Sequence, residues 1–564
     1  MPTPDCLTTS THRDLDLQLV DGTWPVDVDG DVLFSAPLIS GAAPYGLFDA
    51  GCAIRLALRP GRHGAAADRF AWRVRPIDTP GRRLQQLDPS WFVANSVGFR
   101  SPFGPLNAAN TAPLPWGDRL FATWDAGRPV ELDPVTLDFV GEVGTIESWG
   151  PSALFGDTLL PTLLSSAHPV VDPDRGGMWT TKLEPALGEG FALAPSVVWW
   201  HPDDTAVRVW PLDGIAFQGS THTVSQTRDW LIVADSGNFR ADMGEILGGE
   251  RTVTVDPDAP VWLVRKDQLL ATAPGTPFRP VCCRVAPPAG HFYARYDDSD
   301  GIAVVWEGMD LVDLGMHIRP DDVDVLGRAV NPASVGLYNM GMAPSSLTEL
   351  VFEPGTGTVV HRATVREDWS MNLQLSAMDW GVEGMDAPEL HHVDYQGCRP
   401  DRITERAASR YADRFDRRSV EEETPGSLVS FERGSLAVRA RWDYEDPGDL
   451  VTSPTFVPRS GGGAASRPGG ADGYVVQPVL SDDGFRVEVF DAADVGAGPT
   501  ATLRAVAREC VPLLLHSAWM PPARGLVDAP RIRFAEEVTD ARLAGLDGEQ
   551  RAAVATVAAE LSAR

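Results

Sequence analysis

The hydrophobic and polar positions of the chain follow the two-residue period of β-strands over most of its length. Short runs of alternating or β-branched residues are bounded by glycine, proline and aspartate, which is typical of strands joined by tight turns. A turn signal separates two such runs at residues 119–137, 347–365 and 474–492, so each stretch predicts a hairpin. Residues 229–235 and 301–309 predict further single strands.

Helical periodicity is confined to a few places, chiefly "DGEQRAAVATVAAELSAR" at the C-terminus. That stretch has an acidic first turn and apolar residues spaced near the helical period of about 3.6. The body of the chain is therefore predicted to be all-β. Hairpins recur through most of the 564 residues without a clear linker, which favours a β-propeller, closed on itself with hidden sheet edges, over several sandwiches.

These patterns divide the chain into three parts. We expect residues 1–20 to form a flexible N-terminal lead and residues 21–530 to form the propeller domain. Residues 531–564 are expected to form a C-terminal extension with an acidic segment and a helix. The sequence indicates no purpose for this extension, and packing on the propeller is the expected arrangement.

The net charge limits the binding partners that we expect, and the cysteines indicate the cellular compartment. The formal net charge of −30 repels phosphate backbones, and the 48 basic residues form no long cluster, so we expect no nucleic-acid partner. The six cysteines include no C-x-x-C pair, which fits a reducing compartment. The sequence has no signal-peptide pattern and no apolar run of 18 residues, so we expect a cytoplasmic protein without a transmembrane segment. The sequence does not decide whether the protein contacts a membrane surface peripherally.

Four of the 11 histidines adjoin strand-like or apolar stretches instead of charged loops. They are His168, His222, His291 and His516. Each of them, taken singly, is more simply explained as a core or surface histidine. The inner strands of a propeller face one axis, however, so one histidine from each of four strands would converge there.

An ordered series of segments resembles the carotenoid cleavage oxygenase family, which also includes stilbene cleavers and retinoid isomerohydrolases. The series begins with "DGTWPVDVDGDVLFSAPLI" at residues 21–39. It continues through "AHPVVDP", "STHTVSQTRDWLIVAD", "APELHHVDYQGCRPD", "TFVPR" and "HSAWMP", in the family's order. The resemblance implies a seven-bladed β-propeller with a cap of loops and short helices over an axial metal site.

The same resemblance implies that His168, His222, His291 and His516 bind Fe(2+) and form the catalytic centre. Neutral imidazole is a suitable ligand for iron. Four nitrogen ligands leave two positions of a six-coordinate ion open, where O2 and substrate or water can bind.

In the family, three glutamates hold three of the ligand histidines through their outer ring nitrogens. The resemblance places Asp125, Glu389 and Ser453 at these positions. Asp125 is one methylene shorter than glutamate, and Ser453 carries no charge, so nearby Asp449 or Glu445 is a candidate to compensate. The alternative for Asp125 and Glu389 is that they are ordinary turn and surface acids.

The implied reaction is oxidative cleavage of a conjugated C=C bond in a long apolar alkene, with O2 supplying the oxygen of two carbonyl products. Trp124 stands where stilbene cleavers that engage a phenol have a lysine, which favours a carotenoid or apocarotenoid substrate. Aromatic residues near the motifs are candidates for a substrate-binding tunnel and equally for propeller core: Trp124, Phe217, Phe292, Trp306 and Trp519.

Two other functions stay open. One is cleavage of a stilbene or styrene-type aromatic alkene. The other is an inactive propeller scaffold that has kept its histidines, which the serine at position 453 makes plausible. A zinc hydrolase site is disfavoured, because structural zinc takes four tetrahedral ligands and hydrolytic zinc usually keeps three protein ligands.

Overall fold

The structure, a computed structural model, describes most of the chain. The described residues are 12–38, 49–95, 98–151, 157–186, 192–217, 219–236, 240, 242, 249–337, 339, 341–372, 374–377, 390–446, 448–460, 470–481, 483–509 and 511–563.

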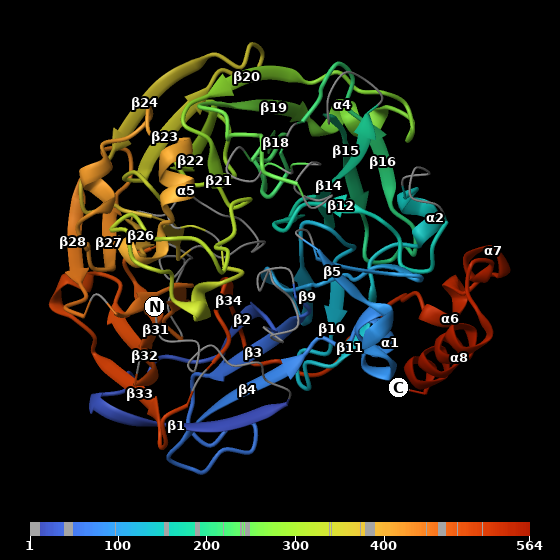
Figure 1. The fold of residues 1–564 in the computed structure, drawn as a ribbon, viewed down its shortest axis with the longest axis horizontal. Helices are drawn as coiled ribbons and strands as arrows, with labels where there is room; N and C mark the ends of the chain where they lie inside the picture. Colours follow the sequence, from blue (N-terminus) through green and yellow to red (C-terminus); the bar gives the residue numbers. More distant parts are fainter. Residues whose placement is uncertain are drawn as a thin grey trace.

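Antiparallel sheets follow one another around a centre, so that the chain runs once around a ring (Figure 1). The first is built from β8 (Ala112–Trp116), β9 (Arg119–Thr123), β10 (Val130–Leu132) and β11 (Phe139–Glu142). The second is built from β12 (Leu164–Ser165), β13 (Val170–Asp172), β14 (Gly177–Ala186), β15 (Ala192–Trp200) and β16 (Arg208–Pro211). The third is built from β17 (Val224–Gln226), β18 (Trp230–Ala234), β19 (Ala259–Arg265) and β20 (Val281–Val285).

Two further sheets of the same kind complete this part of the ring. One is built from β21 (Ala289–Ala294), β22 (Ile302–Gly308), β23 (Ser346–Phe352) and β24 (Val359–Val365). The other is built from β25 (Gln374–Ser376), β26 (Leu390–Tyr395), β27 (Ser427–Glu432) and β28 (Val438–Asp443). A small separate sheet joins β5 (Val93–Asn95), β6 (Gly98–Ser101) and β7 (Gly104–Pro105).

A ten-stranded sheet closes the ring with strands from both ends of the chain. Its members, in spatial order, are β29 (Leu450–Val451), β31 (Gly473–Ser481), β32 (Gly484–Asp491), β33 (Ala501–Ala505), β1 (Arg13–Gly22), β4 (Phe70–Pro76), β3 (Gly51–Ala57), β2 (Asp31–Pro37) and β34 (His516–Met520), with β30 (Thr455–Pro458) paired to β31. β1 pairs with β4 and β33, and β2 pairs with β3 and β34. N-terminal and C-terminal strands therefore close the ring together.

The N-terminal segment differs from the flexible lead expected over residues 1–20. From Arg13 onward the chain forms β1, which is hydrogen-bonded on both sides and buries Leu17 completely. The backbone pairing explains the difference, since two neighbouring strands satisfy its polar groups. Residues 1–11 lie outside the described residues.

The strands and the long helix read from the sequence pattern are confirmed. β9–β10, β23–β24 and β31–β32 are the three expected hairpins, and β18 and β22 are the expected single strands. The C-terminal helix is α8 (Gly548–Ser562). It begins with a capping box, in which the Asp547 side chain accepts from Gln550 N and the Gln550 side chain bonds back to Asp547 N.

The hydrophobic core lies between neighbouring sheets. One core cluster joins residues of β18 and β19 to residues of β21, β22 and β23, and another joins β21–β23 to β26 and β27. The sheets therefore pack face to face around the ring, as expected for strands with alternating apolar positions.

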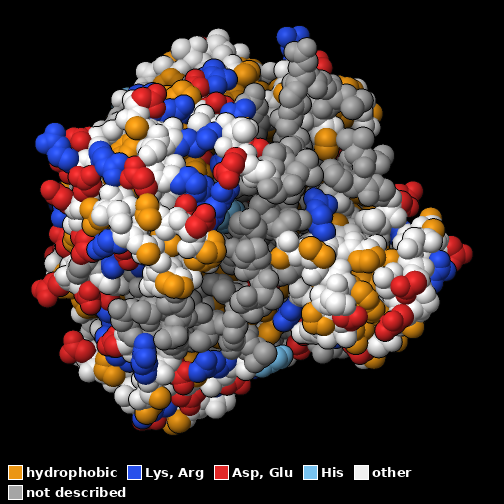
Figure 2. Space-filling view, in the orientation of Figure 1, with side chains coloured by type: hydrophobic (Ala, Val, Ile, Leu, Met, Phe, Trp, Pro, Cys, Tyr) orange, Lys and Arg blue, Asp and Glu red, His pale blue; other side chains and the backbone are white. Residues whose placement is uncertain are grey.

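Within the described residues, the other α-helices are short and lie outside the sheets. They are α1 (Pro80–Leu87), α2 (Ile146–Trp149), α4 (Lys266–Ala271), α5 (Glu405–Arg410), α6 (Phe534–Glu537) and α7 (Asp540–Leu543). α6, α7 and α8 form the C-terminal lobe at the right of Figure 1, beside α1 and the β9–β11 sheet. In the described part of the chain, no helix is both long and apolar enough to cross a membrane. Acidic and basic side chains are interspersed over the described surface of the face shown in Figure 2.

Candidate metal centre

The structure brings His168, His222, His291 and His516 together from four different sheets. His168 precedes β13, His222 precedes β17, His291 lies in β21 and His516 begins β34. The four residues offer nitrogen atoms that all lie within 4.8 Å of one another. Residues that are far apart in the sequence therefore form one compact cluster.

Direct bonds between neighbouring edge strands hold three of these histidines in place. His168 N donates to His222 O at 3.1 Å, and Val224 N donates back to His168 O at 3.2 Å. Thr223 Oγ1 donates to Gly290 O at 2.7 Å, next to His291. Because the backbones are joined on either side of the imidazoles, the directions of the side chains are fixed by the ring itself.

Two carboxylates hold the outer nitrogens of two histidines. His222 Nδ1 lies 2.8 Å from Asp125 Oδ1, and His291 Nδ1 lies 3.0 Å from Glu307 Oε2. An ionised carboxylate can only accept a hydrogen bond, so each of these Nδ1 atoms carries the ring hydrogen. Nε2 of each ring then carries a lone pair and no hydrogen, which is the form that binds a metal.

The inner nitrogens fit a shared cation. His222 Nε2 and His291 Nε2 face each other at 3.2 Å. With both Nδ1 atoms protonated, both Nε2 atoms are acceptors, so their lone pairs repel unless a cation lies between them. Two nitrogens bound at right angles to one ion, each about 2.1 Å away, lie about 3 Å apart. Imidazole ligands suit zinc, copper, iron and nickel, and the residues present therefore fit a transition-metal ion.

Burial keeps three of the imidazoles in the neutral, ligating form. Burial and the neighbouring histidines hold the pKa of His168 and of His516 well below the usual value of 6.5. Burial also lowers the pKa of His291, although Glu307 opposes the shift. The His222 side chain is 20% exposed and that of Asp125 is 30% exposed, so the cluster opens toward solvent on this side.

Glu307 is the residue of this site that the sequence analysis missed. His291 in β21 and Glu307 in β22 are directly opposite each other across the two strands, after a register shift between Ala289 and His291. Ser376 Oγ donates to the other carboxylate oxygen of Glu307. A signal was present, because Glu307 is the single charge at the end of the apolar run Ile302–Trp306.

Glu389 and Ser453 are the other two residues expected to hold ligand histidines. Glu389 lies outside the described residues. Ser453 is buried between β29 and β30, and its Oγ lies 3.3 Å from Thr452 Oγ1. The same segment flanks the His516 strand, since Thr452 Oγ1 donates to Leu514 O at 2.9 Å. The structure thus places Ser453 beside β34, and its described hydrogen bond is to Thr452.

Three of the aromatic residues considered for a substrate tunnel lie in packed cores. Phe292 stacks on Trp306, with ring centroids 5.1 Å apart, inside the core between β19 and β23. Phe217 packs edge-on against Trp262 at 4.4 Å, in another core cluster. Side chains alternate between the faces of a strand, so Phe292 points away from the face that carries His291.

Trp124 and Trp519 are the other two aromatic residues considered for the tunnel. Trp124 is buried next to Asp125, and its carbonyl accepts from Ser165 Oγ at 2.9 Å. Trp519 is half-buried, and its Nε1 donates to Asp29 O at 2.9 Å. Because its ring nitrogen is turned toward the segment before β2, Trp519 acts in the packing of the ten-stranded sheet.

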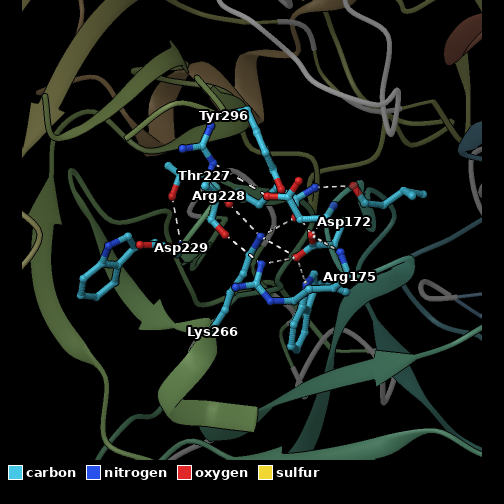
Figure 3. Close-up of polar contacts among 12 residues, drawn as sticks. Asp172, Arg175, Thr227, Arg228, Asp229, Lys266 and Tyr296 are labelled. Atoms are coloured by element: carbon cyan, nitrogen blue, oxygen red, sulfur yellow. Dashed lines mark hydrogen bonds and ion pairs between the residues drawn. The ribbon is translucent and has the colours of Figure 1, made fainter. Parts of the chain in front are cut away.

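A second polar cluster lies farther along the same edge strands. Asp172 ends β13, Gln226 ends β17 and Tyr296 follows β21, each four or five residues after a histidine of the first cluster. Figure 3 shows Lys266 and Arg175 pointing toward Asp172. These side chains therefore join three of the strands that carry the histidines.

Lys266 is the centre of this second cluster. Its Nζ donates to Asp172 Oδ2 at 2.8 Å, to Gln226 Oε1 at 2.7 Å and to Thr227 O at 2.7 Å. The side chains of Lys266 and Asp172 are fully buried. All three hydrogens of the ammonium group thus have an acceptor, which is what a buried lysine requires.

Comparison with solved structures identifies the fold. A variant of Synechocystis apocarotenoid oxygenase has a TM-score of 0.60 and 17% identity, over 92% of this chain and 98% of that chain. The cobalt-substituted Synechocystis enzyme has a TM-score of 0.59 and 16% identity, with the same coverage of both chains. A chimera of that oxygenase with RPE65 has a TM-score of 0.59 and 15% identity, also over 92% and 98%. The ring of sheets is therefore the propeller fold of these proteins.

Sequence comparison identifies the family. The rice protein carotenoid cleavage dioxygenase 7, chloroplastic, is 34% identical over 84 residues, which are 12% of this chain and 13% of that protein. The chain thus matches only a small part of this curated relative. The family described as retinal pigment epithelial membrane protein matches residues 10–521. Because that match spans nearly the whole chain, the protein belongs to this family, the carotenoid cleavage oxygenases.

Proposed function

We propose that the protein is a non-haem Fe(II)-dependent dioxygenase that cleaves a conjugated C=C bond of a carotenoid or apocarotenoid. One O2 molecule is consumed, and one of its oxygen atoms enters each of two carbonyl products. The observation that carries the proposal is the four-histidine cluster, in which two inner nitrogens face each other at 3.2 Å while carboxylates hold the outer nitrogens. The family match supports the class of substrate.

Under this proposal, His168, His222, His291 and His516 hold the iron. Iron(II), when bound, supplies the electrons that make O2 reactive toward a conjugated double bond. Asp125 and Glu307 keep the Nε2 lone pairs of His222 and His291 directed inward by accepting the outer ring hydrogens. Their negative charges partly balance the charge of the ion, since all four ligands are neutral.

We also propose a number of blades for the propeller. Five sheets of four or five strands follow one another, and the ten-stranded sheet has room for two more units of similar size. We therefore count seven blades, the last two joined through β1 and β33, with the loops and short helices of one face as the cap. A dry interior beneath such a cap would suit a long apolar substrate.

The test is iron content together with product masses. The purified protein, loaded with Fe(II) under low oxygen, is offered a β-apocarotenal and, separately, the stilbene resveratrol under 18O2. We expect about one iron per chain and two aldehydes from the apocarotenal, each with one labelled oxygen. Aldehydes from resveratrol alone would instead show the stilbene-cleaving alternative.

Histidine variants separate the enzyme from a binding scaffold. His291→Ala should lose iron and cleavage together, because it removes a ligand and leaves Glu307 without its partner. The matched control is His361→Ala, since His361 is exposed on β24. A wild-type protein without bound iron, or a His291→Ala variant with full activity, would overturn the proposal in favour of a scaffold.

A further inference from the structure

The C-terminal extension, residues 531–563, packs against the β9–β10 hairpin. The turn of this hairpin, residues 124–129, carries Asp125, the residue that holds His222. The family match ends at residue 521, so the extension lies outside the part of the chain shared with the family. Its contacts with the hairpin therefore involve residues outside the family match.

The first contact is a buried ion pair at the end of the turn. Both oxygens of Glu537, at the end of α6, accept from the Arg128 guanidinium, at 3.0 and 2.7 Å. The two side chains are only 7% and 2% exposed. Glu537 Oε1 also accepts from Ile146 N at 2.7 Å, and Arg128 also donates to Gly144 O at 2.6 Å and to Glu142. Because water has little access to these buried groups, the hydrogen bonds fix the position of the Arg128 guanidinium.

The second contact is on a strand of the same hairpin. Arg531 donates to both oxygens of Glu131 in β10, each at 2.9 Å. Arg119 in β9 donates to the same carboxylate, at 2.8 Å to each oxygen. Glu131 thus links both strands of the hairpin to the extension, through bidentate pairs that fix orientation as well as distance.

Further hydrogen bonds to the turn come from Ser165 and from Asn107, whose Nδ2 donates to Arg128 O at 2.9 Å. Ser165 N donates to Asp125 O at 2.7 Å, and Ser165 Oγ donates to Gly127 O at 2.6 Å. A pocket lined by Thr79, Pro80 and Gly127, among others, borders the turn on the side of α1. The turn thus borders a pocket, and the polar contacts at Arg128 and Glu131 add to its support.

The short side chain of Asp125 links these contacts to the histidine cluster. An aspartate reaches one methylene less far than a glutamate, so its backbone must lie closer to the imidazole to make the 2.8 Å bond to His222 Nδ1. We propose that the C-terminal extension, through Glu537 and Arg531, is a positioning element that sets the turn so that Asp125 reaches His222. This inference rests on the proposed function, in which His222 is a metal ligand.

The test compares Glu537→Gln with Glu560→Gln in the full-length protein. Glu560 also joins the extension to the rest of the protein, by an ion pair with Arg83 of α1 at 3.1 Å, and its described polar contact is with α1 instead of the hairpin. In the metal-free protein, we expect faster amide hydrogen exchange over residues 119–132 for Glu537→Gln alone. Titrated with Co(II), this variant should bind about tenfold more weakly than wild type and show an altered visible spectrum, because the support of a ligand histidine is loosened.

Equal Co(II) affinity and spectra for Glu537→Gln and Glu560→Gln would overturn the proposal, because a purely structural role lowers the melting temperature without changing the metal site. If Glu537→Gln does not fold, exchange of the wild-type protein decides: the peptides 119–132 and 531–543 should open with the same free energy. Opening of 531–543 while 119–132 stays protected would overturn it. A wild-type protein that binds no Co(II) would refute the metal site itself, while the exchange measurements still test whether the extension positions the turn.

Discussion

Two acidic side chains decide the orientation of two histidines at the candidate centre. Asp125 reaches His222 from a turn, with part of its side chain exposed, whereas Glu307 reaches His291 from inside a strand and is fully buried. A hydrogen bond to a buried charge is stronger than one near water, because the surrounding dielectric is lower. Glu307 should therefore matter more for metal binding than Asp125.

We predict that Glu307→Gln weakens Co(II) or Fe(II) binding by about 10- to 100-fold, the usual effect of losing an outer partner of a metal-ligating histidine. The amide has the same size as the carboxylate but no charge, so His291 becomes a poorer donor to the metal. Equilibrium dialysis with metal analysis measures the change. Glu353→Gln is the matched control, since Glu353 is exposed at the end of β23. Unchanged affinity in Glu307→Gln would show that Glu307 only packs against His291.

Edge strands are the elements on which the site depends. β13, β17 and β21 each carry or follow a histidine at one end, and each leads to a member of the Lys266 cluster at the other. The histidine cluster and the Lys266 cluster thus hold the same strands at their two ends. Strands fixed at two points cannot shift in register, and a shift of one residue would turn every side chain to the opposite face.

The Lys266 cluster predicts a pH dependence of stability. Burial lowers the pKa of Lys266 from 10.5 to about 8, although the charge of Asp172 opposes the shift. Below pH 8 the lysine is charged in the folded and the unfolded protein, and above pH 10.5 it is neutral in both. Between these limits the unfolded chain binds more protons, so the contribution of Lys266 to the free energy of unfolding rises with pH, by at most about 1.4 kcal/mol per pH unit.

Lys266→Met removes this contribution. The difference in unfolding free energy between wild type and variant should therefore grow from pH 8 to pH 10, as measured by urea unfolding at each pH. Taking the difference cancels the other groups that titrate in this range. A difference that stays constant or shrinks with rising pH would contradict the prediction.

The whole molecule is a ring closed by its own ends, and the histidines come from widely separated sheets of that ring. β34, which begins with His516, pairs with β2 near the N-terminus. An ion bound to all four histidines would therefore connect early, middle and late parts of the chain. Such an ion binds the folded ring and not the unfolded chain, so binding must stabilise the fold.

Metal removal should accordingly lower the melting temperature. At a free metal concentration 100 times Kd, the expected stabilisation is about 2.7 kcal/mol. Differential scanning calorimetry after chelation, and again after addition of Co(II), measures the shift. His291→Ala should lose the dependence on metal, whereas His361→Ala should keep it. A melting temperature that does not respond to metal in the wild-type protein would contradict a site formed by the folded ring.

The sequence by itself determined the class of structure and the set of histidines. Period-two patterns with turn residues predicted the hairpins of β9–β10, β23–β24 and β31–β32, because these signals are local. The apolar surroundings of the four histidines, with the family resemblance, singled them out from the others. An acidic first turn and apolar residues spaced near the helical period likewise predicted the helix α8.

The family resemblance placed Asp125 near the histidines, but only the tertiary structure decided which histidine it holds and which other groups surround them. Glu307 faces His291 because of a register shift between β21 and β22, and one-residue shifts are not encoded in an alternating pattern. The pairs Asp125 with His222 and Arg128 with Glu537 join residues that are 97 and 409 positions apart, and they depend on how the ring closes. Composition and spacing do not record such contacts, because the positions of the partners are set by the packing of whole sheets and of the extension against them.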